Sequence, residues 1–82
     1  MLVEMGSSTS TVEICIPLLN EGTDVLRSTQ GRVCRPDEVQ VLATPNYDPA
    51  VEEWAFPPGT KVQVAKEMRN GRELLVARQR IA

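Results

Sequence analysis

The dipeptide Asn70-Gly71 is the feature of this sequence that most constrains the fold. It separates two strand-like runs, residues 60–66 and residues 73–78. Asparagine and glycine tolerate a positive φ better than other residues, and a two-residue type I′ turn requires a positive φ at both of its central positions. The sequence therefore predicts a tight β-hairpin near the C-terminal end of the chain, and with it an antiparallel sheet.

Three further segments have the alternating pattern of half-buried strands, and turn residues separate them. They are residues 12–16, the weaker run 25–34 with an expected bend at Gly31, and residues 39–43. The chain has 82 residues, which is enough for one domain. Five short strands without a long helix predict an all-β fold, a small antiparallel five-stranded SH3-like barrel. An OB-type barrel is the alternative, and it would need a helix between its third and fourth strands.

The connection between the third and fourth expected strands, residues 44–59, contains all three aromatic residues and four of the six prolines. We expect Asp48 to cap a single helical turn that begins at Pro49. Pro57-Pro58-Gly59 is expected to form a turn with Pro58 and Gly59 at its centre. Connections of this length in a small domain are often functional.

The aromatic residues of this connection have two interpretations. In the structural one, Trp54 and Phe56 lie on the same side of an extended segment and close one end of the barrel. In the functional one, aromatic and acidic side chains together form a groove for a peptide, as in SH3 domains. The candidate binding residues are Tyr47, Glu52, Glu53, Trp54 and Phe56.

Residues 1–11 are expected to form a flexible leader, and residues 12–82 the barrel domain. The apolar stretch at residues 1–5 contains an acidic residue and is too short for an export signal or a membrane-spanning helix. We therefore expect a cytoplasmic protein.

Histidine is absent, and the chain has only two cysteines, Cys15 and Cys34. These residues cannot form a catalytic triad, a Cys/His pair or a zinc site, and two cysteines are too few for a disulfide framework. The turn expected at residues 20–24, where Gly22 can adopt a positive φ, offers too few oxygen ligands for calcium. We expect reduced cysteines, no cofactor, no metal and no catalysis.

Charge is distributed unevenly along the chain. Residues 1–60 carry three basic and nine acidic residues, whereas residues 61–82 carry six basic and two acidic residues. The two complementary halves favour a homodimer or a larger homo-oligomer, which could enclose a ligand site shared between subunits. The basic C-terminal hairpin suggests nucleic-acid binding as an alternative function. Against it, the pI is about 5.0 and every aromatic residue lies in the acidic half.

Two separated motifs carry a family resemblance. Residues 18–27 read LLNEGTDVLR, and residues 52–62 read EEWAFPPGTKV, with NYDP at residues 46–49 between them. This order resembles a family of short uncharacterised bacterial proteins that pair LLNEGTDV-aromatic-R with EEWEFPPG-x-V. The resemblance spans about residues 12–76 and implies an SH3-type barrel, but it implies no activity. The chain departs from the pattern at Leu26, where tryptophan is usual, and at Ala55, where glutamate is usual.

Overall fold

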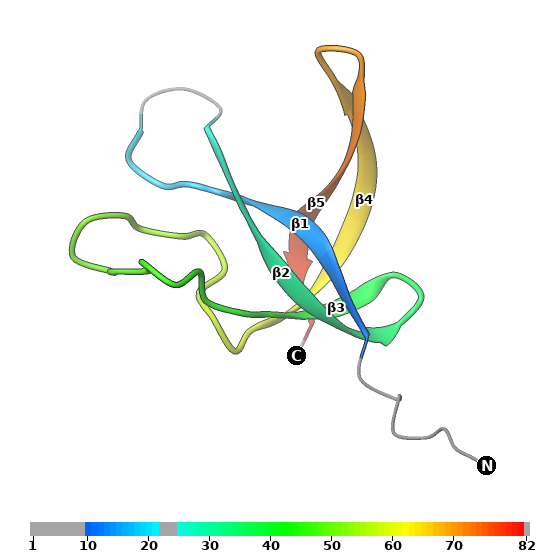
Figure 1. The fold of residues 1–82 in the computed structure, drawn as a ribbon, viewed down its shortest axis with the longest axis horizontal. Coiled ribbons are helices and arrows are strands. Elements are labelled where there is room, and N and C mark those ends of the chain that lie inside the picture. Colours follow the sequence, from blue (N-terminus) through cyan, green and yellow to red (C-terminus); the bar gives the residue numbers. More distant parts are fainter. Residues whose placement is uncertain (1–9, 22–24, 82) are drawn as a thin grey trace.

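The computed structural model describes residues 10–21 and 25–81, and this part of the chain folds into five strands without a helix (Figure 1). They follow one another around a closed barrel. The strands are β1 (Thr11–Pro17), β2 (Leu26–Arg35), β3 (Glu38–Val41), β4 (Lys61–Arg69) and β5 (Arg72–Arg80). The prediction of a small all-β, five-stranded SH3-like barrel is confirmed. The expected conformation of Gly22 lies outside the described residues.

The barrel is mixed, so the prediction of a purely antiparallel sheet is wrong. Consecutive strands pair antiparallel, whereas β1 and β5 run in the same direction and pair at Cys15 and Val76. Strands that follow one another as antiparallel neighbours alternate in direction, so the first and the fifth point the same way. A barrel of five such strands can therefore close only through a parallel contact.

The second strand is continuous where the sequence suggested a bend. Gly31 lies within β2 and pairs with Val12 on one side and Val41 on the other. The irregularity in β2 lies instead between Val33 and Arg35. Gly31 therefore does not interrupt the strand. A Cβ at this position would lie 3.0 Å from Ile14 Cδ1 and 3.1 Å from Val39 Cγ2, so glycine lets these side chains approach the strand closely.

The barrel begins earlier than expected. Thr11 belongs to β1, and the carbonyl of Ser10 accepts a hydrogen bond from the Val33 N–H at 2.8 Å. The predicted end of the leader at residue 11 is therefore wrong, because residues 10 and 11 are bonded to β2. Residues 1–9, the rest of the expected leader, lie outside the described residues.

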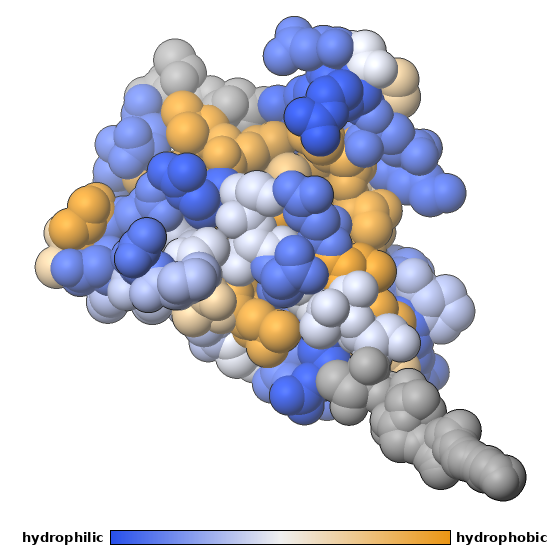
Figure 2. Space-filling model, in the orientation of Figure 1, coloured by the Kyte–Doolittle hydropathy of each residue, from blue (hydrophilic) through white to orange (hydrophobic). Residues whose placement is uncertain are grey.

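Two of the turns predicted from local sequence, at residues 70–71 and 57–59, are present. Asn70 and Gly71 have φ values of 52° and 80°, and they join β4 to β5 in the expected type I′ geometry. Thr60 N–H donates to the Pro57 carbonyl at 3.1 Å, and Gly59 has a φ of 93°. The β4–β5 hairpin projects from the barrel, with hydrophilic residues at its tip and hydrophobic surface along its stem (Figure 2).

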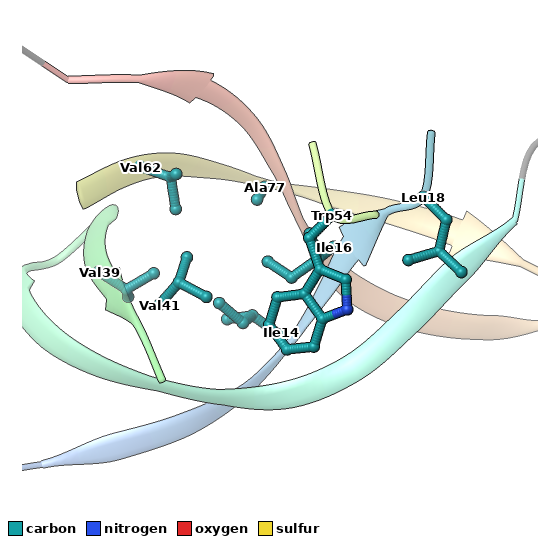
Figure 3. Close-up of a cluster of buried hydrophobic side chains, with 8 residues drawn as sticks. All are labelled: Ile14, Ile16, Leu18, Val39, Val41, Trp54, Val62 and Ala77. Carbon is teal, nitrogen blue, oxygen red and sulfur yellow. The ribbon is translucent and has the colours of Figure 1, made fainter. Parts of the chain in front are cut away.

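One hydrophobic cluster fills the barrel (Figure 3). Its buried members are Ile14, Ile16, Leu18, Val39, Val41, Trp54, Val62 and Ala77. Cys15 and Val76 are also buried, although they do not belong to this cluster; they lie where β1 meets β5. The described residues contain no helix with the length and apolar character needed to cross a membrane.

Candidate functional site

The connection of residues 44–59 is tied to the end of β1 by backbone hydrogen bonds. Leu19 N–H donates to the Glu53 carbonyl at 2.8 Å, and Ala55 N–H donates to the Pro17 carbonyl at 2.9 Å. These bonds flank an isolated β-bridge at residue 54. The connection therefore behaves as a short strand that continues the pairing of the barrel, and its position is fixed relative to β1.

Trp54 closes one end of the barrel. Its side chain is only 3% exposed, and its indole ring lies among Ile14, Ile16 and Leu18 (Figure 3). The structural interpretation of Trp54 is confirmed. A ring so completely covered has no free face for a ligand, so the aromatic groove expected from the sequence cannot include it.

The other two aromatic residues also pack inward. The Tyr47 ring meets Trp54 edge to face, with the ring centroids 4.7 Å apart and an angle of 65° between the planes. Tyr47 and Phe56 are partly buried and pack against the core cluster. Aromatic side chains thus attach the connection to the barrel.

Glu52 is the centre of the polar contacts in the connection. The Arg27 Nε donates to both carboxylate oxygens at 3.0 Å, and its Nη2 donates to Oε2 at 2.6 Å. The Trp54 Nε1 donates to Oε1 at 2.9 Å. The hydrogen bonds from Arg27 first, and then the one from Trp54, hold the pKa of Glu52 below its usual value. Glu52 is therefore ionised, and its carboxylate links β2 and the core tryptophan to the connection.

Glu53 and Asp48 fix the backbone of the connection on either side of Glu52. Asn20, which has a positive φ of 61°, donates from Nδ2 to Oε1 of Glu53 at 2.5 Å. Ala50 N–H donates to Oδ1 of Asp48 at 2.9 Å, and Glu52 N–H donates to the Asp48 carbonyl at 3.0 Å. The single capped turn predicted at Asp48 is therefore present, as one turn and not as a helix.

A groove of about 340 Å³ lies beside this part of the connection. We call it the connection groove; its lining residues are Arg27, Ser28, Thr44, Asn46, Asp48, Val51 and Glu52. Of the five candidate binding residues, only Glu52 lines it. Asp48 and Val51 belong to the connection and could have been included from the sequence. Arg27 and Ser28 come from β2, and no local sequence pattern connects them to this site.

The basic hairpin is partly neutralised by Glu67, one of its two acidic residues. Arg78 donates to both oxygens of Glu67, at 2.5 and 2.6 Å, and Arg69 Nη2 lies 3.2 Å from Oε1. These hydrogen bonds, chiefly from Arg78, lower the pKa of Glu67 to about 2. Glu67 is therefore ionised at neutral pH and lies between two of the residues on which nucleic-acid binding would depend.

The described residues contain no group of three or more Cys, Asp or Glu side chains placed to hold a metal. Both cysteines are free; Cys34 is exposed and Cys15 is buried. Burial raises the pKa of the Cys15 thiol, which disfavours the reactive thiolate.

Comparison with known proteins found no match to a family model, a curated protein or a solved structure. The family resemblance of residues 18–27 and 52–62 stays a prediction.

Proposed function

We propose that this chain is a small, non-catalytic bacterial interaction module that binds an extended segment of a partner protein in the connection groove. The observation that carries the proposal is Val51, which is 79% exposed beside a groove whose other walls are polar. An exposed aliphatic side chain next to oriented polar groups is a common arrangement in recognition sites. Loops held by a rigid scaffold are also where small folds place recognition residues.

The connection is fixed before any ligand arrives. The Arg27–Glu52 ion pair and the Asn20–Glu53 hydrogen bond hold it at two successive positions, and the core tryptophan follows directly. A segment that is already ordered loses little conformational entropy on binding, so more of its contact energy contributes to affinity.

Charge indicates the chemistry of the partner segment. The groove contains the carboxylates of Asp48 and Glu52 and one cation, Arg27, which is already paired with Glu52. Thr44 and Asn46 add further oxygen acceptors. The partner segment is therefore expected to carry a lysine or arginine that reaches Asp48, next to an aliphatic residue that contacts Val51.

Selection from a random peptide library on the immobilised domain tests this proposal. We expect enrichment of peptides that combine a basic and an aliphatic residue, with amide shift changes at residues 44–52 when a selected peptide is added. Val51→Lys should lower the affinity at least tenfold, because it removes the apolar contact and repels the basic residue. Asp48→Asn should lower it about threefold to tenfold, while the amide oxygen still caps the turn.

Met68→Lys is the matched control, because Met68 is 67% exposed on the β4–β5 hairpin and does not line the groove. This variant should bind the selected peptides as the unmodified chain does. If Val51→Lys binds them equally well while its spectrum remains that of the folded domain, the groove is not the recognition site.

We propose further that the chain forms a homodimer or a larger homo-oligomer in the cytoplasm. The opposite charges of residues 1–60 and 61–82 support self-association, and two free cysteines suit a reducing compartment. Light scattering at high micromolar concentration should give at least twice the monomer mass of 9.1 kDa. Added salt should lower that mass, because it screens the attraction between the halves. A mass near 9.1 kDa at low salt would contradict self-association.

A further inference from the structure

The outer part of the β4–β5 hairpin pairs with no other strand in the part of the chain that the structure describes. The pairing of β4 with β3 ends at Gln63, and β5 pairs with β1 at Val76 alone. Residues 66–75, which we call the hairpin arm, therefore pair only with each other, and they project from the barrel (Figure 1). A two-stranded ribbon is marginally stable by itself in water, so the arm gains stability from any surface that covers it.

One face of the arm carries four side chains in a diagonal arrangement. Met68 pairs with Glu73, and Lys66 pairs with Leu75, so all four lie on the same face of the ribbon. Because Leu75 packs on the core cluster, this face continues the inner wall of the barrel. The two apolar side chains occupy one diagonal of this group, and the two opposite charges occupy the other. We call these four residues the arm patch.

The arm patch is accessible. Met68 is 67% exposed, and Lys66 and Glu73 are exposed as well. Among the described residues neither of these two charged side chains has an ion-pair partner, since the ion pairs of the hairpin are made by Glu67 on the opposite face. Glu73 and Leu75 also line a cleft of about 340 Å³, which leaves that side of the patch open.

We propose that a second copy of the chain covers the arm patch, so that two hairpin arms pack face to face about a twofold axis. This inference rests on the self-association proposed above and names the surface that carries it. An axis along the Met68–Leu75 diagonal brings the apolar side chains of the two copies together. The same axis brings Lys66 onto the partner's Glu73, and Glu73 onto the partner's Lys66. The patch is therefore complementary to itself, as an isologous interface requires.

Charge selects this axis among the possible ones. An axis along the other diagonal would place Lys66 on the partner's Lys66, and an axis along or across the strands would place each charge on an apolar side chain. With about 3.4 Å per residue along a strand and about 4.8 Å between strands, the selected axis makes the arms cross at roughly 70°. Orthogonal sheet packings have similarly steep crossings. A twofold axis also closes the assembly, so the expected product is a dimer.

The dimer is expected to be weak. Two crossed arms bury less than the roughly 1,200 Å² of a standard interface, which corresponds to a dissociation constant of about 10–100 μM. The chain should therefore be a monomer at low micromolar concentration and a dimer at high micromolar concentration, where light scattering and sedimentation equilibrium can measure the dissociation constant.

Charge reversal within the arm patch tests the proposed surface. Lys66→Glu opposes the partner's Glu73 with a second carboxylate, and the twofold axis repeats this repulsion, so the dissociation constant should rise at least tenfold. Glu73→Lys should have the same effect through two pairs of like positive charges. Arg80→Glu is the matched control, because it makes the same change of net charge at an exposed position of β5 outside the arm. It should change the dissociation constant by less than about twofold.

Mixing the two weakened variants provides the sharper test. In a heterodimer of Lys66→Glu with Glu73→Lys, both crossed pairs are attractive again, so an equimolar mixture should dimerise about as well as the unmodified chain. The double variant Lys66→Glu/Glu73→Lys should also recover, as a homodimer, which shows that the substitutions leave the fold intact. The net charges of the mixed variants are −4 and 0, compared with −2 for the unmodified chain. Attraction between net charges therefore cannot produce the recovery.

The possible results separate this surface from self-association in general. An unmodified chain that stays near 9.1 kDa at high micromolar concentration overturns both. A dimer on which Lys66→Glu and Arg80→Glu have equal effects keeps self-association and overturns the arm patch as its surface. Failure of the mixture to recover also overturns the crossed pairs. Val51→Lys should leave the dimer unchanged, because Val51 lies in the connection groove and outside the arm.

Discussion

Replacing Trp54 with alanine is expected to lower the free energy of unfolding by about 3–5 kcal/mol. The indole is 3% exposed and packs against Ile14, Ile16 and Leu18, so its removal leaves a cavity at one end of the barrel. The loss is a large fraction of the total for a domain of this size, because small domains are stable by only about 5–15 kcal/mol. Urea denaturation followed by far-ultraviolet circular dichroism measures the change without relying on tryptophan fluorescence.

Trp54→Phe separates the two contributions of the side chain. Phenylalanine keeps an aromatic ring in the core but cannot donate the Nε1 hydrogen bond to Glu52. It should therefore be intermediate in stability, above Trp54→Ala and below the unmodified chain. Met68→Ala, at an exposed position, should change the stability by less than about 0.5 kcal/mol. If Trp54→Ala changes it as little as Met68→Ala, the tryptophan does not hold the barrel end.

Trp54 also explains why the fold was easier to predict than the site. A large aromatic residue in a small chain is rarely left without a packing role, so burial of Trp54 follows from composition. The positive φ values at Asn70, Gly71 and Gly59 likewise depend on residues next to one another in the sequence. Features set by local conformation or by one dominant side chain were therefore predictable.

The contacts that build the connection groove are not local. Arg27 and Glu52 are 25 positions apart, and their pairing depends on how the connection folds back against β2. Neither residue belongs to a pattern that indicates the other. The continuity of β2 was missed for a similar reason, because Gly31 disfavours a strand in isolation and gains its pairing from β1 and β3. The parallel closure, by contrast, follows from the number of strands, and it could have been derived once five consecutive strands were predicted.

Replacing Gly31 with alanine is expected to destabilise the barrel by about 1–3 kcal/mol, because the site is already full. An added Cβ would lie 3.0 Å from Ile14 Cδ1, and 3.1 and 3.2 Å from Cγ2 and Cβ of Val39. Gly31 does not have a positive φ, so this substitution measures packing without backbone strain. Gly59→Ala makes the opposite comparison, since its Cβ would meet nothing within 4 Å but its φ is 93°. It should cost about 1 kcal/mol through strain alone.

Combining Gly31→Ala with Ile14→Val tests whether the Cδ1 atom of Ile14 causes the crowding at position 31. Valine lacks the Cδ1 atom that lies nearest to the added methyl group, so the double variant should be more stable than the sum of the single changes predicts. Ile14→Val alone should cost about 0.5–1.5 kcal/mol. We expect a favourable coupling of about 0.5–1 kcal/mol, and only partial rescue, because the Val39 atoms remain and its Cβ is fixed by the backbone of β3. If the two changes are additive in urea denaturation, Ile14 does not pack on Gly31. The close approach of β1 to β2 would then not depend on the absence of a side chain at position 31.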